Sequence, residues 1–97
     1  MVSVYIMRNG SEPLFKVGIS VDPERRRRQL QTGNPRRVKL LWSIEVPDAQ
    51  KTEGVLHAYL RERGCAIRGE WFELQDDVVV MLARQLLQHK KFGSDVH

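Results

Sequence analysis

Alternating β-forming side chains at the start of the chain predict a hairpin. Residues 2–8 and 14–20 are both rich in β-branched and aromatic side chains, which favour strands. Asn9 and Gly10 stand between the two segments, and this dipeptide is a strong signal for a tight hairpin turn. The two segments are therefore expected to pair as antiparallel strands.

A helix start signal follows the hairpin. Asp22 is a good N-cap residue, and Pro23 fits the first position of a helix. The helix should end at about Gln31 or Thr32, because Gly33 is a natural C-terminal stop.

The rest of the chain adds a strand, two helices and a short extended segment. Residues 37–46 are predicted to form a third strand, and residues 70–74 a short extended segment. Helices are predicted from the Asp48 cap to about Arg63, and over residues 76–90. The order β-β-α-β-α, followed by a C-terminal helix, predicts an α+β fold with a small three-stranded antiparallel sheet flanked by helices.

The length and composition fit one domain. Ninety-seven residues, of which 41% are hydrophobic, can bury one modest core, expected within residues 1–90. Residues 91–97 are expected to form a flexible tail. No apolar run approaches the length of a membrane span, and the N-terminus does not resemble a signal peptide, so we expect a cytoplasmic protein without a membrane partner. The single cysteine, Cys65, cannot form an internal disulfide.

The charge of the chain favours an anionic partner. The net charge is +4, and seven of the 16 basic residues lie between positions 25 and 39. Nucleic acid is the commonest partner for such a basic stretch. A solvated cationic helix face is the alternative interpretation.

Three polar side chains stand where apolar residues would be easier to explain. Tyr5 and Lys16 lie in the two strands of the predicted hairpin, which brings them onto the same sheet. Arg26 lies four residues before Leu30 and therefore shares the inward face of the first helix, whereas Arg25 and Arg28 should point more toward solvent. Each residue taken alone could equally be an ordinary packed or solvated side chain.

Two further polar residues share one face of the second predicted helix. Glu53 and His57 are four positions apart and could bind a metal or move protons, or simply form a surface hydrogen-bonded pair. One carboxylate supplemented by water and phosphate oxygens is how Mg²⁺ is usually bound. Glu70 stands beside Trp71 and Phe72, and could support the site or pair with a nearby arginine.

Several short segments occur in an order that is typical of a known family. They are Val4-Tyr5-Ile6, Lys16-Val17-Gly18, Gly18 to Arg26, Gln29 to Pro35, Glu53 to His57, and Gly69 to Phe72.

In these segments the chain resembles the GIY-YIG nuclease superfamily, and most closely its compact phage- and bacteria-associated branch related to the meiotically up-regulated gene family. The resemblance covers about residues 3–74. Arg26 falls at the position of the family's characteristic arginine. Lys16 replaces the usual second tyrosine, a change that is itself a feature of this branch. A histidine found in some members corresponds to Leu30 here, and His57 is a conjectural replacement.

The resemblance implies a metal-dependent endonuclease that hydrolyses DNA phosphodiester bonds. Glu53 would hold one Mg²⁺ or Mn²⁺ ion, and Arg26 would bind the phosphate and stabilise the transition state. Tyr5 would accept a proton from the attacking water, Lys16 would lower the pKa of Tyr5 or orient the water, and His57 would assist. Other basic residues would contact backbone phosphates. These are Arg25, Arg28, Arg36, Arg37 and Lys39.

Two other functions stay open at the level of sequence. A nucleic-acid-binding module without catalysis would use the same basic stretch. A protein-interaction domain could use the apolar face of the helix predicted over residues 76–90, although core packing is the simpler use of that face. A dimer is possible, and it would offer a second active site for cutting both strands of a duplex.

Overall fold

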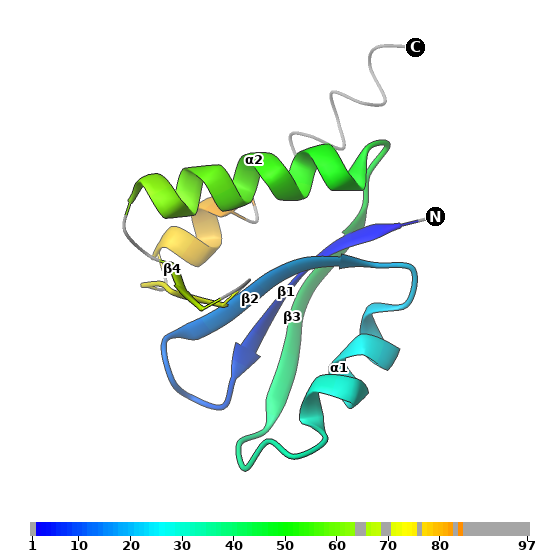
Figure 1. Cartoon of the computed structure of the whole chain (residues 1–97), viewed down its shortest axis with the longest axis vertical. Coiled ribbons are helices and arrows are strands. Elements are labelled where there is room, and N and C mark those ends of the chain that lie inside the picture. Colours follow the sequence, from blue (N-terminus) through cyan, green and yellow to red (C-terminus); the bar gives the residue numbers. More distant parts are fainter. Residues whose placement is uncertain (1, 64–65, 69–70, 76, 83, 85–97) are drawn as a thin grey trace.

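The computed structural model describes residues 2–63, 66–68, 71–75, 77–82 and 84. Within these ranges the chain has an α+β fold in which a sheet lies between helices (Figure 1). The elements in chain order are β1 (Ser3–Asn9), β2 (Leu14–Ser20), α1 (Pro23–Gln31), β3 (Val38–Glu45), α2 (Ala49–Glu62), β4 (Ala66–Arg68) and β5 (Trp71–Glu73).

The sheet is antiparallel throughout and has the strand order β3-β1-β2-β5-β4. The three predicted strands are thus confirmed as its first three members, with β1 in the centre of that group. The extended segment predicted over residues 70–74 contains β5. In the described residues β5 and β4 extend the predicted three-stranded sheet to five strands, and β4 was not predicted at all. A three-residue strand carries too few alternating positions to be recognised from its sequence.

The turn between β1 and β2 follows the prediction from Asn9 and Gly10. Gly10 has a φ of 63°, a left-handed conformation that glycine adopts without a steric penalty. Its backbone N–H donates to the carbonyl of Arg37 at 2.7 Å. The hairpin turn is therefore attached to the loop that leads into β3.

Local capping determines where α1 starts and stops. The carboxylate of Asp22 accepts a hydrogen bond from the backbone N–H of Arg25 at 3.1 Å, and Pro23 occupies the first turn. Gly33, with a φ of 77°, follows the last helical residues. Both predicted helix signals are confirmed. No residue of α1 is fully buried, so the helix lies on the surface of the sheet.

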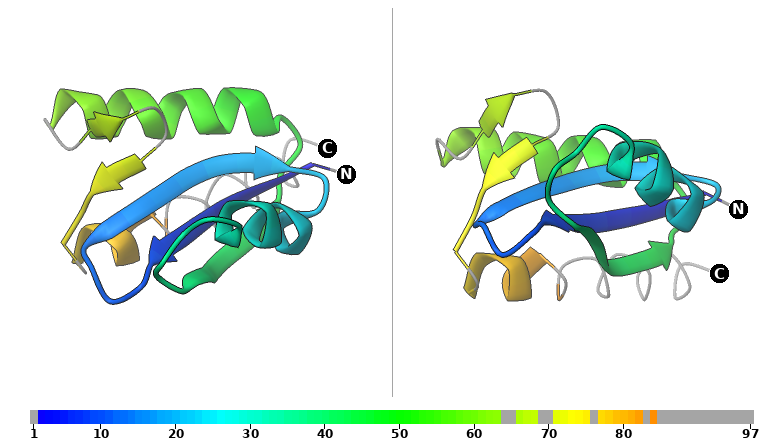
Figure 2. Two further views of the ribbon diagram at one scale, coloured as in Figure 1. Left: turned by 60° about the horizontal axis from the view of Figure 1, so that its bottom comes forward. Right: turned by 90° about the horizontal axis from the view of Figure 1, so that it is seen from below.

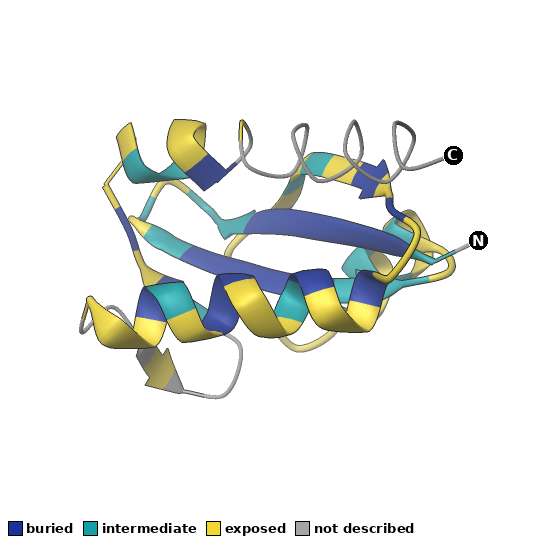
Figure 3. Cartoon of the chain, turned by 90° about the horizontal axis from the view of Figure 1, so that it is seen from above, coloured by how far each residue is buried: buried dark blue, intermediate teal, exposed yellow. Residues whose placement is uncertain are grey.

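The two faces of the sheet carry different layers (Figure 2). We call the side covered by α2 the α2 face and the side covered by α1 the α1 face. The α2 face holds the larger core, where side chains such as Val4, Ile6 and Phe15 meet Leu56 and Leu60 of α2. Figure 3 shows the buried positions of α2 turned toward the strands and its exposed positions turned outward.

A helical segment near the C-terminus also contributes to the larger core. Residues 77–82 and 84 are helical, and Val78, Val79 and Leu82 pack against the cluster on the α2 face. This part of the helix predicted over residues 76–90 therefore uses its apolar side for core packing. The end of that helix, the domain boundary predicted at residue 90 and the predicted tail lie outside the described residues. No helix in the described part of the chain combines the length and apolar composition needed to cross a membrane.

Candidate functional site

The register of β1 and β2 places Tyr5 and Lys16 on the same face of the sheet. Tyr5 pairs with Gly18, while Lys16 pairs with Met7. Tyr5 and Met7 are two positions apart in β1, so their side chains point to the same side. Both belong to a small cluster that Leu30 of α1 covers, which identifies this side as the α1 face. Tyr5 and Lys16 are therefore diagonal neighbours on the α1 face, with Tyr5 beneath α1 and Lys16 on the side of β5.

Both of these polar side chains are buried. Tyr5 is 1% exposed and Lys16 is 6% exposed. The ammonium nitrogen of Lys16 lies 5.4 Å from the centroid of the Trp71 ring, which is within the range of a cation–π interaction. Gly18 has no side chain, so it adds nothing to the α1 face opposite the Tyr5 ring. The α1 face therefore combines a small apolar cluster with a buried phenol and a buried amine.

Arg26 lies on the inward side of α1, as its spacing from Leu30 predicted. It is half-buried, whereas Arg25 and Arg28 are exposed. Its guanidinium donates to Oε1 of Gln29 at 3.3 Å. α1 leaves the end of β2, which pairs with the start of β1, and leads to the start of β3, which pairs with the end of β1. Arg26 comes one turn before Leu30 in α1, so it lies nearer to the start of β1.

Arg27 also points inward, which the sequence analysis did not foresee. Its guanidinium donates to the carbonyl of Val38 at 3.3 Å and to Oε1 of Glu24 at 2.7 Å. The hydrogen bond from Arg27, together with its charge, lowers the pKa of Glu24, and Glu24 in turn raises the pKa of Arg27. Arg27 therefore attaches α1 to β3, and Arg26 is the other half-buried arginine of this helix.

Glu53 and His57 lie on α2 beside β2. His57 is 7% exposed, its Nε2 donates to the carbonyl of Val17 at 2.7 Å, and its ring lies 5.2 Å from that of Phe72. These contacts give His57 a structural role between α2 and the sheet, while its predicted catalytic role remains a prediction. Glu53 is half-buried one helical turn earlier, on the same side of α2. It therefore lies beside β2 and not beneath α1.

The predicted phosphate-contacting residues divide into two groups. Arg25, Arg28, Arg36 and Arg37 are exposed on α1 and on the loop that follows it. Lys39 is exposed on β3, between Val38 and Leu40, whose side chains belong to the cluster on the α1 face. Since strand side chains alternate, that of Lys39 points to the opposite side of the sheet, away from Tyr5 and Lys16.

Three residues of the α1 face were not predicted as functional. Trp71 is partly buried on the α1 face, whereas its neighbour Phe72 is fully buried. Asn9 and Asn34 are joined by a 2.9 Å hydrogen bond across the sheet end. The alternation of side chains within β5 could have distinguished Trp71 from Phe72, but only once the strand itself was known. Glu70 and Cys65 lie outside the described residues.

Among the described residues, no group of three or more histidine, cysteine, aspartate or glutamate side chains could together hold a metal ion. The half-buried carboxylate of Glu53 fits the alternative in which the protein supplies one oxygen ligand and water and phosphate supply the others.

Comparison with known proteins identifies a family but no individual relative. A family model described as the T5orf172 domain matches residues 2–87. T5orf172 domains are nuclease-like domains of phages and bacteria. No curated protein and no solved structure matched the chain.

Proposed function

We propose that the chain, which belongs to the T5orf172 domain family, is a metal-dependent DNA endonuclease whose active site lies on the α1 face and the adjoining edge of β2. The observation that carries this proposal is the burial of a tyrosine and a lysine as diagonal neighbours on the face that carries a helix rich in arginine. Burying an amine costs free energy, and an apolar side chain would serve packing better. A functional requirement explains why both groups are present.

The side chains of the site divide the work of phosphodiester hydrolysis. Arg26 would bind the scissile phosphate and stabilise the charge that grows on its oxygens. The Tyr5 phenolate would accept a proton from water as the water oxygen attacks phosphorus and the bond to the leaving oxygen breaks. Lys16, the diagonal neighbour of Tyr5, would place a positive charge on the same face and would help to orient the water. His57 would fix the position of α2 against β2.

Glu53 is the residue that would hold the divalent ion. A bound Mg²⁺ or Mn²⁺ ion neutralises negative charge on the phosphate and on the leaving oxygen. Glu53 is half-buried on the side of α2 that contacts β2, and this position supports its choice as the ligand. Exposed arginines on α1 and the following loop would guide the DNA backbone without reading its sequence.

A plasmid-nicking assay in Mg²⁺, Mn²⁺ or EDTA tests the proposal. Wild-type protein should nick supercoiled plasmid with either metal and should be inactive in EDTA. Glu53→Gln should abolish the cleavage while leaving the thermal unfolding midpoint close to the wild-type value. Glu62→Gln is the matched control, because Glu62 is an exposed carboxylate on the same helix. Full cleavage by Glu53→Gln would exclude Glu53 as the metal ligand.

The exposed arginines also support a second candidate, a nucleic-acid-binding module without catalysis. Four exposed arginines on α1 and the following loop suffice for salt-dependent binding. Such a module would bind DNA in low salt and cleave it in no metal. The same nicking assay, paired with a binding titration at several salt concentrations, separates the two functions.

A further inference from the structure

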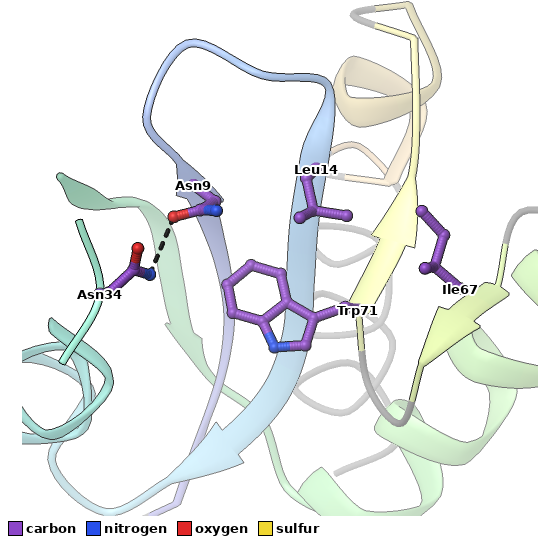
Figure 4. A pocket seen from close by; sticks show the side chains of 5 residues that line it. All are labelled: Asn9, Leu14, Asn34, Ile67 and Trp71. Atoms are coloured by element: carbon purple, nitrogen blue, oxygen red, sulfur yellow. Dashed lines mark hydrogen bonds between the residues drawn. The ribbon is translucent and has the colours of Figure 1, made fainter. Parts of the chain in front are cut away.

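An open cleft of about 600 Å³ lies at one end of the α1 face (Figure 4). Its walls come from four parts of the fold: the end of β1, the start of β2, the loop after α1, and the pair β4 and β5. The lining residues are Asn9, Leu14, Asn34, Ile67 and Trp71. Trp71 pairs with Lys16 in the sheet, so the cleft directly adjoins the proposed active site.

The cleft offers an apolar, flat surface. The Trp71 ring extends from β5 across β2 toward β1, with the side chains of Leu14 and Ile67 to its sides (Figure 4). Ile67 is 57% exposed, so its side chain is accessible to a ligand in the cleft. Lys16 lies over the Trp71 ring. These groups suit a planar aromatic ligand.

Two amide side chains supply hydrogen-bonding groups at the opposite wall. The Asn34 amide donates to Oδ1 of Asn9 at 2.9 Å, and Oδ1 of Asn34 accepts from the backbone N–H of Arg36 at 3.0 Å. These bonds fix the orientation of both amides. The Nδ2 group of Asn9 makes no hydrogen bond to any residue in the described part of the chain, and it lies on the side of Trp71 (Figure 4). It can donate to a carbonyl oxygen or ring nitrogen of a ligand.

Positive charge borders the cleft on two sides. Lys16 lies on the side of the proposed active site. Arg36 and Arg37 are exposed on the loop that carries Asn34; Arg36 is paired with Glu12 at 2.7 Å, and Arg37 adds a second positive charge. A ligand with a planar aromatic group between two phosphates would match this arrangement of a ring surface between cations.

We propose that the cleft binds one unpaired base of the DNA substrate, on the side where Lys16 and Trp71 join the cleft to the proposed active site. The base stacks on Trp71 and accepts a hydrogen bond from Asn9, and its flanking phosphates contact the cations at the border. This inference rests on the proposed function and specifies its substrate class. A base within a duplex is stacked and paired, so the enzyme favours DNA that contains single-stranded, mismatched or branched positions.

A binding experiment with matched oligonucleotides tests the cleft. The probes are a labelled oligothymidine and the same backbone with abasic residues in place of the bases, both titrated in EDTA and followed by fluorescence anisotropy. Trp71→Leu should weaken oligothymidine binding roughly 5- to 150-fold, the range found for removing an aromatic platform from one stacked base. It should leave binding of the abasic probe unchanged. Trp71→Phe keeps an aromatic ring and should retain most of the affinity.

Two further measurements keep the test independent of how well Trp71→Leu folds. The chain has two tryptophans, so Trp42→Phe isolates the fluorescence of Trp71. Oligothymidine should quench this fluorescence, and the abasic probe should not. Asn9→Ala should also weaken oligothymidine binding selectively.

The outcomes separate the cleft from the proposed endonuclease. In one outcome, Trp71→Leu selectively loses oligothymidine binding, but the wild-type protein cleaves no DNA in any metal. This result would support the base site and contradict the endonuclease. In another outcome, the protein cleaves DNA with metal, but wild type and Trp71→Leu each bind the two probes equally well. This result would overturn the base site and leave the endonuclease standing. Absence of Trp71 quenching by oligothymidine would also overturn it.

Discussion

The α2 face of the sheet is packed with aliphatic and phenyl side chains, whereas the α1 face, which carries a polar helix, buries a tyrosine and a lysine. The helix on the first face contributes fully buried residues such as Leu56 and Leu60, and α1 contributes none. The comparison indicates that one face supplies most of the stability of the domain. The α1 face can therefore bury polar groups that are poor for packing, and the proposed site combines these groups with Glu53, which lies on α2 beside β2.

The largest expected effect is on the catalysis proposed for the α1 face. Arg26→Ala should lower the cleavage rate about 10²- to 10³-fold, comparable to the loss of one group that stabilises a transition state. The free energy of unfolding should change little, because Arg26 is half-buried on a helix without buried residues. Single-turnover cleavage and chemical denaturation measure the two quantities.

Arg28→Ala is the matched control for this prediction, because Arg28 is an exposed arginine on the same helix. It should weaken DNA binding modestly and leave the single-turnover rate at saturation unchanged. Equal rates for Arg26→Ala and Arg28→Ala would remove the distinction between the two arginines.

The converse effect is expected on the α2 face. Leu56 is 1% exposed in the larger core. Leu56→Ala should lower the free energy of unfolding by about 2–5 kcal/mol, the range for a leucine truncated in a packed core. The variant should keep its cleavage rate at temperatures where it stays folded. If Leu56→Ala lowers the cleavage rate of protein that is still folded, the packing of the α2 face and the proposed catalysis are not independent.

A smaller loss of stability is expected at the contact between α2 and β2. His57→Phe keeps a ring against Phe72 but removes the donor to the Val17 carbonyl. A buried carbonyl without its partner costs about 1–3 kcal/mol, which chemical denaturation measures. The cleavage rate of the folded variant tells whether His57 also acts in catalysis: an unchanged rate would assign it to structure alone, and a loss larger than tenfold would support the predicted catalytic role.

The smallest expected effect concerns pH and the attachment of α1. Since Arg27 lowers the pKa of Glu24 in the folded protein, Glu24 stabilises the fold at pH values above its ordinary pKa of 4.5. This contribution is lost as the pH falls through the lower folded-state pKa. Glu24→Gln should therefore reduce stability slightly at pH 7 and should have no effect at pH 2.

Glu45→Gln, at an exposed carboxylate of β3, is the control. Equal pH profiles for Glu24→Gln and wild type would contradict the assignment.

The amino-acid sequence by itself determined the local elements of this protein. The turn at Asn9 and Gly10, the Asp22 and Pro23 cap, and the stop at Gly33 act through backbone conformations that depend on a few neighbouring residues. The spacing of Arg26 and Leu30 also predicted correctly which side of α1 faces the sheet. These features need no knowledge of distant residues.

Only the tertiary structure decided which side chains meet. The register of β1 and β2 brought Tyr5 and Lys16 onto one face, and the bond of His57 to Val17 joins residues that lie 40 positions apart. Lys39 was grouped with the other cations by its sequence position, yet strand alternation places it on the opposite side of the sheet. The cleft depends on Trp71, Asn9 and Asn34 converging from separate elements. Such contacts depend on strand register and on the packing of helices and loops against the sheet, which no single local pattern in the sequence specifies.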